Sequence, residues 1–130
     1  MNSFNGNMAE VTFLKQTMEK GYTISKPVVG EYKYDFIVDS HKLYRVQVKS
    51  TNNFSERNSR YKVNVAYGGD TKRVYTADQI DIFAIYVRER DEWYLMPVND
   101  VNTKTLNLYP HRESNGTFEK YKNKWDIFSR

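Results

Sequence analysis

The chain has 130 residues, of which 20 are Lys or Arg and 16 are Asp or Glu, so its net charge is +4 at pH 7. This length suits one domain, and we expect residues 1–130 to fold as a single unit around one core. The absence of Cys and the presence of only two His exclude disulfides and thiolate zinc sites and disfavour a histidine-built triad. Without a membrane-length apolar run or a signal-peptide pattern, we expect a cytoplasmic protein that is not secreted and binds no membrane.

The N-terminal segment predicts an amphipathic helix over residues 8–20. Asn7 is a candidate N-cap, and Gly21 is well placed to end the helix. Glu10 follows Asn7 by three residues, which also suits a capping box. Apolar residues recur every three or four positions, the spacing of one buried stripe: Met8, Val11, Leu14 and Met18.

Two strands joined by a three-residue loop are predicted over residues 34–39 and 43–50, where β-branched and aromatic residues alternate with polar ones. If Asp39 faces Leu43 across the loop, then Ile37 faces Arg45 and Asp35 faces Gln47. This register gathers the Asp35 carboxylate, the Gln47 amide and the Lys49 amine on one surface. The opposite surface is expected to pack on the core through Tyr44, Val46 and Val48.

The remaining pattern predicts a polar loop at 52–59, a half-exposed strand through Tyr61, Val63 and Val65, and a turn at 68–70. Residues 80–87 are nearly all apolar and suit a strand buried on both faces. Another strand is expected over 93–96. A short packing helix is expected from the spacing of Phe118, Tyr121, Trp125 and Phe128. The fold class is therefore α/β of mixed α+β character, with a central sheet.

Charge is unevenly distributed along the chain. Residues 42–73 hold eight basic and two acidic side chains, whereas residues 74–100 hold two basic and six acidic ones. A basic block beside a carboxylate-bearing region suggests a polyanionic partner, and a phosphate backbone fits that description. A solvated basic face is the alternative. The candidates for phosphate contacts are Arg57, Arg60, Lys62, Lys72 and Arg73.

A carboxylate, an amide and a lysine on adjacent strands suit metal-dependent hydrolysis of a phosphodiester. Asp35 can hold a hard cation such as Mg²⁺, which prefers oxygen ligands, and Lys49 can orient or deprotonate the attacking water. One carboxylate supplies too few protein ligands for a Mg²⁺ site. Glu10, beside the apolar stripe of the first helix, is the candidate for a second.

These residues resemble a known family. Glu10 on an N-terminal helix, then YDFIV at 34–38 and VQVKST at 46–51, look like the core of the PD-(D/E)XK nucleases. The segments YTADQIDIFAIYV and EWYLMP add to the resemblance, which runs over most of residues 5–100. Gln47 stands at the variable acidic position. With Gln at this position, the chain resembles the branch of the family that contains an intron-encoded homing endonuclease and its phage and bacterial relatives.

The resemblance implies a restriction-endonuclease-like core, with a central mixed sheet flanked by helices, in a protein of a bacterial or phage-infected cell. It also implies that Glu10, Asp35 and the Val48 carbonyl bind Mg²⁺, for which Mn²⁺ can substitute. Lys49 would be the water-positioning base. Gln47 would be a catalytic-site residue that removes one negative charge and leaves the number and affinity of metals open.

Each assignment has a structural alternative: Glu10 as part of a capping box, Asp35 as a strand-edge carboxylate, Gln47 as a plain hydrogen-bonding residue, and Lys49 with Arg45 as a solvated stripe.

The expected function is metal-dependent DNA cleavage, either of a specific duplex site in the manner of a homing endonuclease or of a Holliday junction by a resolvase of the same superfamily. Cutting two strands needs paired sites, so we expect a homo-oligomer, a dimer or larger. A non-catalytic DNA-binding module is the alternative of another class.

Overall fold

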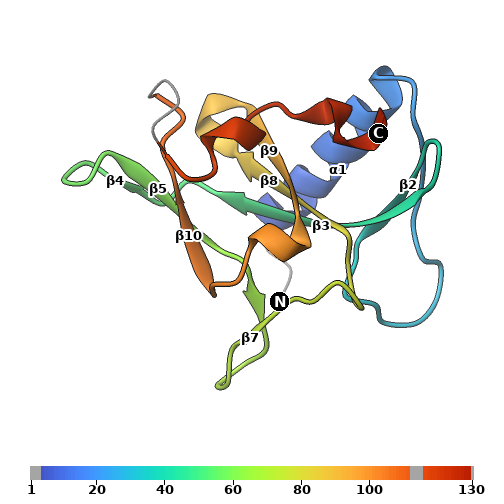
Figure 1. Cartoon of the computed structure of the whole chain (residues 1–130), viewed down its shortest axis with the longest axis horizontal. Coiled ribbons are helices and arrows are strands. Elements are labelled where there is room, and N and C mark those ends of the chain that lie inside the picture. The colour runs from blue at the N-terminus through green and yellow to red at the C-terminus, as the bar shows by residue number, and fades with distance from the viewer. Residues whose placement is uncertain (1–3, 112–115, 130) are drawn as a thin grey trace.

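A five-stranded mixed sheet forms the centre of the computed structural model, which describes residues 4–111 and 116–129 (Figure 1). Its strand order is β1–β2–β3–β8–β9. The β3 and β8 strands run parallel, and the other neighbouring pairs run antiparallel. The central mixed sheet is as predicted. Its strands are β1 (Thr23–Ser25), β2 (Phe36–Asp39), β3 (Leu43–Thr51), β8 (Ile82–Val87) and β9 (Glu92–Pro97).

The β2–β3 hairpin has the predicted register. Asp39 faces Leu43 and Ile37 faces Arg45 across the short loop. The register follows from local signals, because a tight loop sets the pairing and alternation decides which face is buried. The core-facing side chains of β3 are buried as expected: Tyr44, Val46 and Val48.

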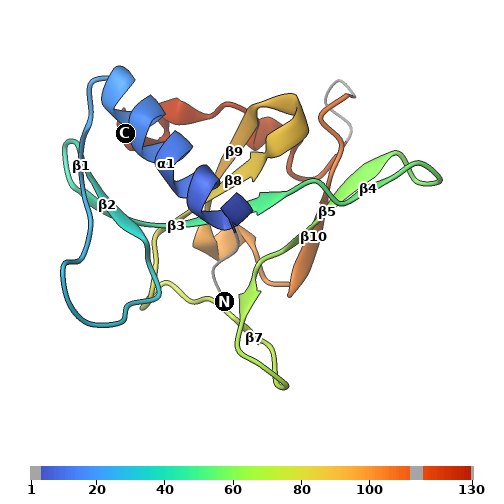
Figure 2. The same cartoon turned by 180° about the vertical axis from the view of Figure 1, so that it is seen from behind.

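The α-helix α1 (Phe4–Glu19) covers one face of the sheet (Figure 2). It begins before Asn7, so the predicted N-cap and capping box are wrong. Gly21 follows the helix with a φ of +90°, as expected for a helix stop. The predicted stripe of Met8, Val11, Leu14 and Met18 is also wrong as a buried face, because all four side chains are exposed.

The buried face of α1 is formed instead by Ala9, Phe13 and Thr17. The Phe13 ring packs against Trp93 and Trp125, with ring centroids 5.4 Å and 5.7 Å away. Large aromatic contacts contribute more burial than the competing stripe of Met, Val and Leu, and Ala9 lets the helix approach closely. The aromatic partners therefore decide which face of the helix turns inward.

A smaller sheet covers the other face, with the order β10 (Thr105–Leu108), β5 (Arg60–Asn64) and β4 (Phe54–Ser55). Tyr61 and Val63 pack there in a second apolar cluster with Phe83 and Ile85 of β8. The central sheet thus separates two clusters, where the sequence predicted one core. The β8 strand is buried on both faces, as predicted.

The hairpin of β6 (Ala66–Tyr67) and β7 (Arg73–Val74) projects from the sheets and turns at Gly68, as predicted. The φ of Gly68 is +102°, and a side chain there would meet the Thr71 carbonyl oxygen at 2.6 Å. This turn therefore requires glycine at position 68.

The predicted C-terminal packing helix is replaced by two short 3₁₀ helices, η3 (Glu119–Tyr121) and η4 (Trp125–Ser129). Between them Asn123 has a φ of +55°, which interrupts a continuous helix. Trp125 and Phe128 are buried nevertheless. The remaining 3₁₀ helices are η1 (Arg88–Arg90) and η2 (Val98–Asp100). Across the described residues, none of the helices combines the length and the apolar character that crossing a bilayer requires.

Candidate active site

Asp35 lies at the start of the β2–β3 hairpin and is fixed to β3 by two hydrogen bonds. Its backbone N–H donates to the Val46 carbonyl at 2.8 Å, and its Oδ2 accepts from the Val48 N–H at 2.9 Å. Burial raises the pKa of the Asp35 carboxyl to about 6, against the lowering effect of the Val48 N–H, while the negative charge of Glu10 adds to the rise. Asp35 is thus a half-buried carboxylate whose charge the protein only partly compensates.

Glu10 reaches this region from α1. Its Oε1 accepts a hydrogen bond from the Lys26 Nζ at 3.2 Å, and its side chain is 25% exposed. The Lys26 ammonium also lies 4.9 Å from the centre of the Phe36 ring. The only positive charge that directly contacts Glu10 among the described ion pairs is therefore a lysine on a loop.

Lys49 projects from β3 on the same surface as Gln47. Burial lowers its pKa, Asp35 opposes this change, and Lys72 contributes to it. The Lys49 Nζ lies 3.4 Å from the Ala66 carbonyl oxygen and 5.3 Å from the centre of the Tyr75 ring. A lysine held by a carbonyl and a ring face, rather than by a full ion pair, remains free to act on a small molecule beside it.

Gln47 and the Val48 carbonyl complete the set of predicted residues on β3. The Gln47 Nε2 lies 3.4 Å from the Val48 carbonyl oxygen, which is a long hydrogen bond. The described residues contain no group of three or more His, Cys, Asp or Glu side chains that could together hold a metal ion. A cation here would have two carboxylates, Glu10 and Asp35, and would need neutral oxygens for its other ligands. Mg²⁺ commonly binds through one or two carboxylates and keeps several waters, so the donor set fits this ion.

Arg45, three residues before Val48, has a structural role instead. Its Nη2 forms an ion pair with the Asp81 Oδ1 at 3.0 Å, and Nη1 donates to the Asp78 carbonyl at 2.7 Å. Nη2 also donates to the Ala77 carbonyl at 2.6 Å. Because four of the five guanidinium N–H groups donate to Asp81 and to two backbone carbonyls, the solvated-stripe alternative is wrong for Arg45, which holds the turn before β8 in place.

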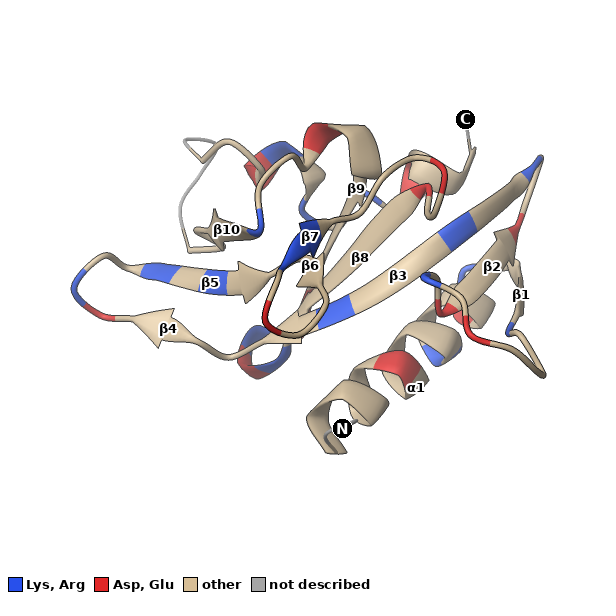
Figure 3. Cartoon of the chain, turned by 90° about the horizontal axis from the view of Figure 1, so that it is seen from below, with Lys and Arg blue, Asp and Glu red and all other residues tan. Residues whose placement is uncertain are grey.

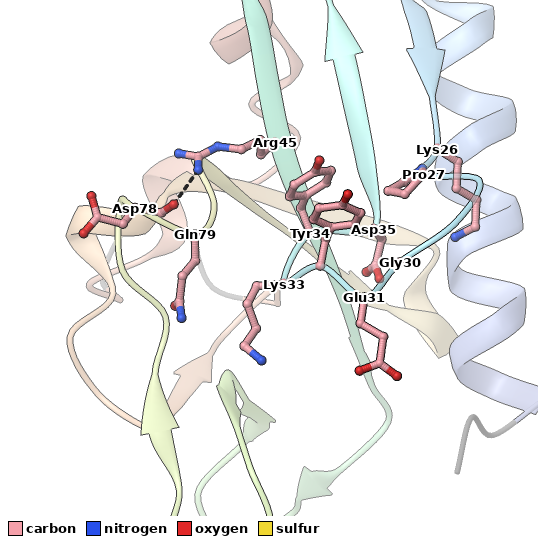
Figure 4. A pocket seen from close by; sticks show the side chains of 11 residues that line it. Lys26, Pro27, Gly30, Glu31, Lys33, Tyr34, Asp35, Arg45, Asp78 and Gln79 are labelled. Carbon is pink, nitrogen blue, oxygen red and sulfur yellow. Dashed lines mark hydrogen bonds between the residues drawn. The ribbon is translucent and has the colours of Figure 1, made fainter.

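An open cleft of about 1140 Å³ lies between the loop that follows β1 and this turn. Asp35 and Lys26 line one side, while Arg45, Asp78 and Gln79 line the other (Figure 4). Figure 4 shows the Arg45 guanidinium turned toward Asp78. Of the predicted catalytic residues Asp35 lines this cleft, whereas Glu10, Gln47 and Lys49 are not among its lining residues, so the cleft gives a large ligand access to the Asp35 side of the site.

The predicted phosphate-contacting residues lie on two hairpins. Arg57 is exposed in the turn between β4 and β5, which carries Arg60 and Lys62, and Lys72 and Arg73 lie on the β6–β7 hairpin. Viewed from below, β5, β7, β3 and α1 cross one side of the molecule, with basic positions on the strands and an acidic position on the helix (Figure 3). Lys72 is close enough to Lys49 to influence its pKa, whereas Arg57 lies at a hairpin tip.

Three further groups at the site were not predicted from the sequence: Lys26, the Ala66 carbonyl and the Tyr75 ring. Lys26 belongs to an exposed loop without periodicity, so no pattern marks it. Tyr75 is 7% exposed, and burial raises its pKa to about 12, so its hydroxyl stays neutral. A single aromatic residue after a basic hairpin is a weak signal, because most of the eleven tyrosines could serve the core.

Known proteins resemble this chain in family and in fold. The model of the PD-(D/E)XK endonuclease family matches residues 2–128. A solved structure of a bacterial homing endonuclease, I-Ssp6803I, has a TM-score of 0.82 and 22% sequence identity, and the match covers 97% of this chain and 93% of that one. No curated protein matches. The structural match shows that the two chains share a restriction-endonuclease-like fold.

Proposed function

Because this chain belongs to the PD-(D/E)XK endonuclease family, we propose that it hydrolyses DNA phosphodiester bonds at a metal-dependent site built from Glu10, Asp35, Gln47 and Lys49. The observation that carries this proposal is the environment of Asp35. Its carboxylate is anchored by the Val48 N–H, and Glu10 and Lys49 are near enough to change its pKa in opposite directions. Two carboxylates and a lysine with a lowered pKa are the groups that this hydrolysis needs.

Glu10, Asp35 and the Val48 carbonyl would hold a divalent cation, Mg²⁺ or Mn²⁺ in its place. When bound, such an ion stabilises charge on the phosphate and lowers the pKa of a bound water. Burial of Asp35 favours this exchange, since a cation replaces the proton that the carboxyl otherwise retains up to a pH of about 6. Lys26 would leave Glu10 when the cation binds, because both compete for the same carboxylate.

Lys49 would position the attacking water and, in its neutral form, accept a proton from it. The water oxygen would form a bond to phosphorus as its proton passes to the Lys49 amine, the bond from phosphorus to the leaving sugar oxygen would break, and that oxygen would take a proton from a solvent water, to which Lys49 later returns its own. The lowered pKa of Lys49 increases the neutral fraction near physiological pH. Gln47 would contribute hydrogen bonds without charge, which is the arrangement of the family branch with Gln at this position.

The proposed substrate is a specific duplex site, cut in the manner of a homing endonuclease. The likeness of fold to I-Ssp6803I supports this choice over a four-way junction. Arg57, Arg60, Lys62, Lys72 and Arg73 would contact the DNA phosphates. Each chain contributes one candidate site, so cutting both strands requires at least a homodimer.

The activity can be tested on a library of random-sequence duplexes with Mg²⁺, Mn²⁺ or EDTA. We expect cleavage of a sequence subset that EDTA abolishes and that Lys49→Ala lowers by about 10³-fold without loss of binding. The matched control is Lys42→Ala, an exposed lysine in the β2–β3 loop. DNA binding by both wild type and Lys49→Ala without any cutting would favour the non-catalytic module instead.

A second comparison separates the two nuclease substrates. A four-way junction and its matched linear arms are incubated with equal amounts of protein. We expect the junction to be cut no faster than arms that contain the selected duplex site. Preferential cutting of the junction at symmetric positions would show a resolvase.

A further inference from the structure

The outer side of α1 carries an apolar surface that the fold leaves uncovered. We name it the outer stripe. Figure 2 shows α1 lying over the sheet, and no other element of residues 4–111 and 116–129 crosses its outer side. The exposed fractions of the outer stripe are Phe4 76%, Met8 45%, Val11 57%, Leu14 37% and Met18 61%.

The size of the outer stripe approaches what an interface requires. With roughly 150–200 Å² for each large apolar side chain, the stripe exposes about 500 Å². Patches of this size on soluble proteins often mark interaction sites. A standard interface buries about 800 Å² from each partner, so the stripe alone supplies more than half of it.

The spacing of the outer stripe suits another helix. Its positions 4, 8, 11, 14 and 18 are separated by steps of four, three, three and four, which keep them on one face of the helix and suit a seam with another helix. Lys15 lies beside the outer stripe, next to Leu14, and its amine forms an ion pair with Glu19 at 2.8 Å. Its aliphatic part can therefore lie in the seam while its charge remains at the rim.

The stripe is also complementary to itself. In an antiparallel pair of α1 helices related by a twofold axis at Val11, the two position numbers in each contact add to 22. Lys15 then faces Asn7, so no two like charges oppose each other. The apolar contacts are Phe4 with Met18, Met8 with Leu14, and Val11 with its own copy.

This arrangement leaves the candidate active site open. Successive helical residues are rotated by roughly 100°, so the Glu10 side chain points at right angles to the direction of Val11. A twofold axis that relates antiparallel helices runs normal to the plane of the two helices. Both copies of Glu10 therefore point toward the same side of the pair.

We propose that a second copy of this chain packs on the outer stripe, in an antiparallel α1–α1 contact centred on Val11. The self-complementary pairing and the exposed area carry this inference. Its consequence for cleavage, two sites facing one duplex, rests on the proposed function.

Cross-linking tests the centre of the contact, because the chain has no cysteine of its own. Val11→Cys places two thiols near the twofold axis, and mild oxidation should convert most of the protein to a disulfide-linked dimer. Val28→Cys is the matched control, since Val28 is 95% exposed and lies outside α1. Equal cross-linking of the two variants, or none at Val11→Cys, would overturn the proposal.

Mass measurement by sedimentation tests the contact without any thiol. We expect wild type to be a dimer or a multiple of a dimer at micromolar concentration, and Val11→Glu to dissociate at least 100-fold more readily. Val28→Glu should keep the wild-type mass. Circular dichroism checks that Val11→Glu remains folded, as expected for an exposed position. A monomeric wild type, or a Val11→Glu variant with unchanged mass, would refute the α1 contact.

The cleavage products distinguish this proposal from the proposed function. If both hold, Val11→Glu should nick a plasmid carrying the duplex site under conditions where wild type linearises it. A wild-type dimer that dissociates on Val11→Glu but cuts no DNA would support the contact and contradict the nuclease site. Linear products at the wild-type rate from a Val11→Glu monomer would contradict the role of this pair in cutting two strands.

Discussion

The two ends of β3 each pair a basic side chain with an aspartate, yet they differ in how completely the charges are satisfied. At one end Arg45 binds Asp81 and two carbonyl groups, and although burial opposes it, the hydrogen bonds from Arg45 hold the pKa of Asp81 below its usual value. At the other end burial raises the pKa of Asp35 to about 6 and lowers that of Lys49. Incomplete compensation is what marks the second end as a site for chemistry.

Replacing the basic residue at each end of β3 should have the largest effects, on the cleavage rate at the Lys49 end and on the free energy of unfolding at the Arg45 end. Lys49→Met should lower the cleavage rate by about 10³-fold, because the attacking water loses its positioning amine. Arg45→Met should instead lower the free energy of unfolding by about 2–3 kcal/mol, since Asp81 and two carbonyls lose their donor. Cleavage rates and urea unfolding of both variants check this. Equal losses of rate after correction for folded protein would contradict the contrast.

Replacing the aspartates should change stability in opposite directions. The Asp35 carboxyl has a pKa of about 6 in the folded chain and about 3.9 when unfolded, so the native state binds more protons between these values. Stability therefore falls as the pH rises from about 4 to 6.

Asp35→Asn should remove that loss and raise the free energy of unfolding at pH 7.5 in EDTA by up to about 3 kcal/mol, with no gain below pH 4. Asp81→Asn should lower it by about 1–2 kcal/mol, because its hydrogen bonds with Arg45 weaken. Urea unfolding across this pH range measures both. A destabilised Asp35→Asn at pH 7.5 would contradict the assigned environment of Asp35.

The contacts of Lys49 provide a finer test. Tyr75 acts as a positioning residue through its ring, so Tyr75→Leu should lower the cleavage rate by about tenfold, whereas Tyr75→Phe should stay near wild type. Admitting water beside Lys49 should also raise its pKa, which would move the ascending limb of the pH–rate profile to higher pH. A merely structural role for Tyr75 would leave that limb unchanged in the folded fraction.

The basic residues around the two ends should differ least, by a few-fold in DNA affinity. Arg73→Ala, on the β6–β7 hairpin beside Lys49, should weaken binding uniformly across sequences and reduce the salt dependence by about one phosphate contact. Lys42→Ala, beyond the Arg45 end, should leave binding unchanged. DNA titrations at several salt concentrations measure both affinities. An equal effect of the two variants would contradict the proposed phosphate contact of the β6–β7 hairpin.

Features of the fold and of the site could be predicted from the sequence where they depend on residues close together in the chain, and not where they depend on contacts between distant segments. The β2–β3 register, and with it the placement of Asp35 and Lys49, follows from a short loop and alternation within one hairpin. The support of Lys49 by Ala66 and Tyr75 depends on how a distant hairpin folds back, which no local pattern encodes.

The orientation of α1 shows a different difficulty. The helix has two faces with suitable spacing, one through Ala9 and Phe13 and one through Val11. Periodicity identifies both, and only the aromatic partners in β9 and η4 choose between them. The sequence pattern was therefore right about amphipathic spacing and wrong about which stripe the protein buries.

The β6–β7 turn has a consequence for how this protein can diversify. Only glycine suits position 68, where the backbone adopts a left-handed conformation against the Thr71 carbonyl, whereas a side chain at Gly69 would meet no atom within 4 Å. Natural variants should therefore keep the shape of this hairpin through one invariant position while changing freely at its neighbour. A lineage could thus acquire new side chains at the hairpin tip without rebuilding the scaffold beneath it.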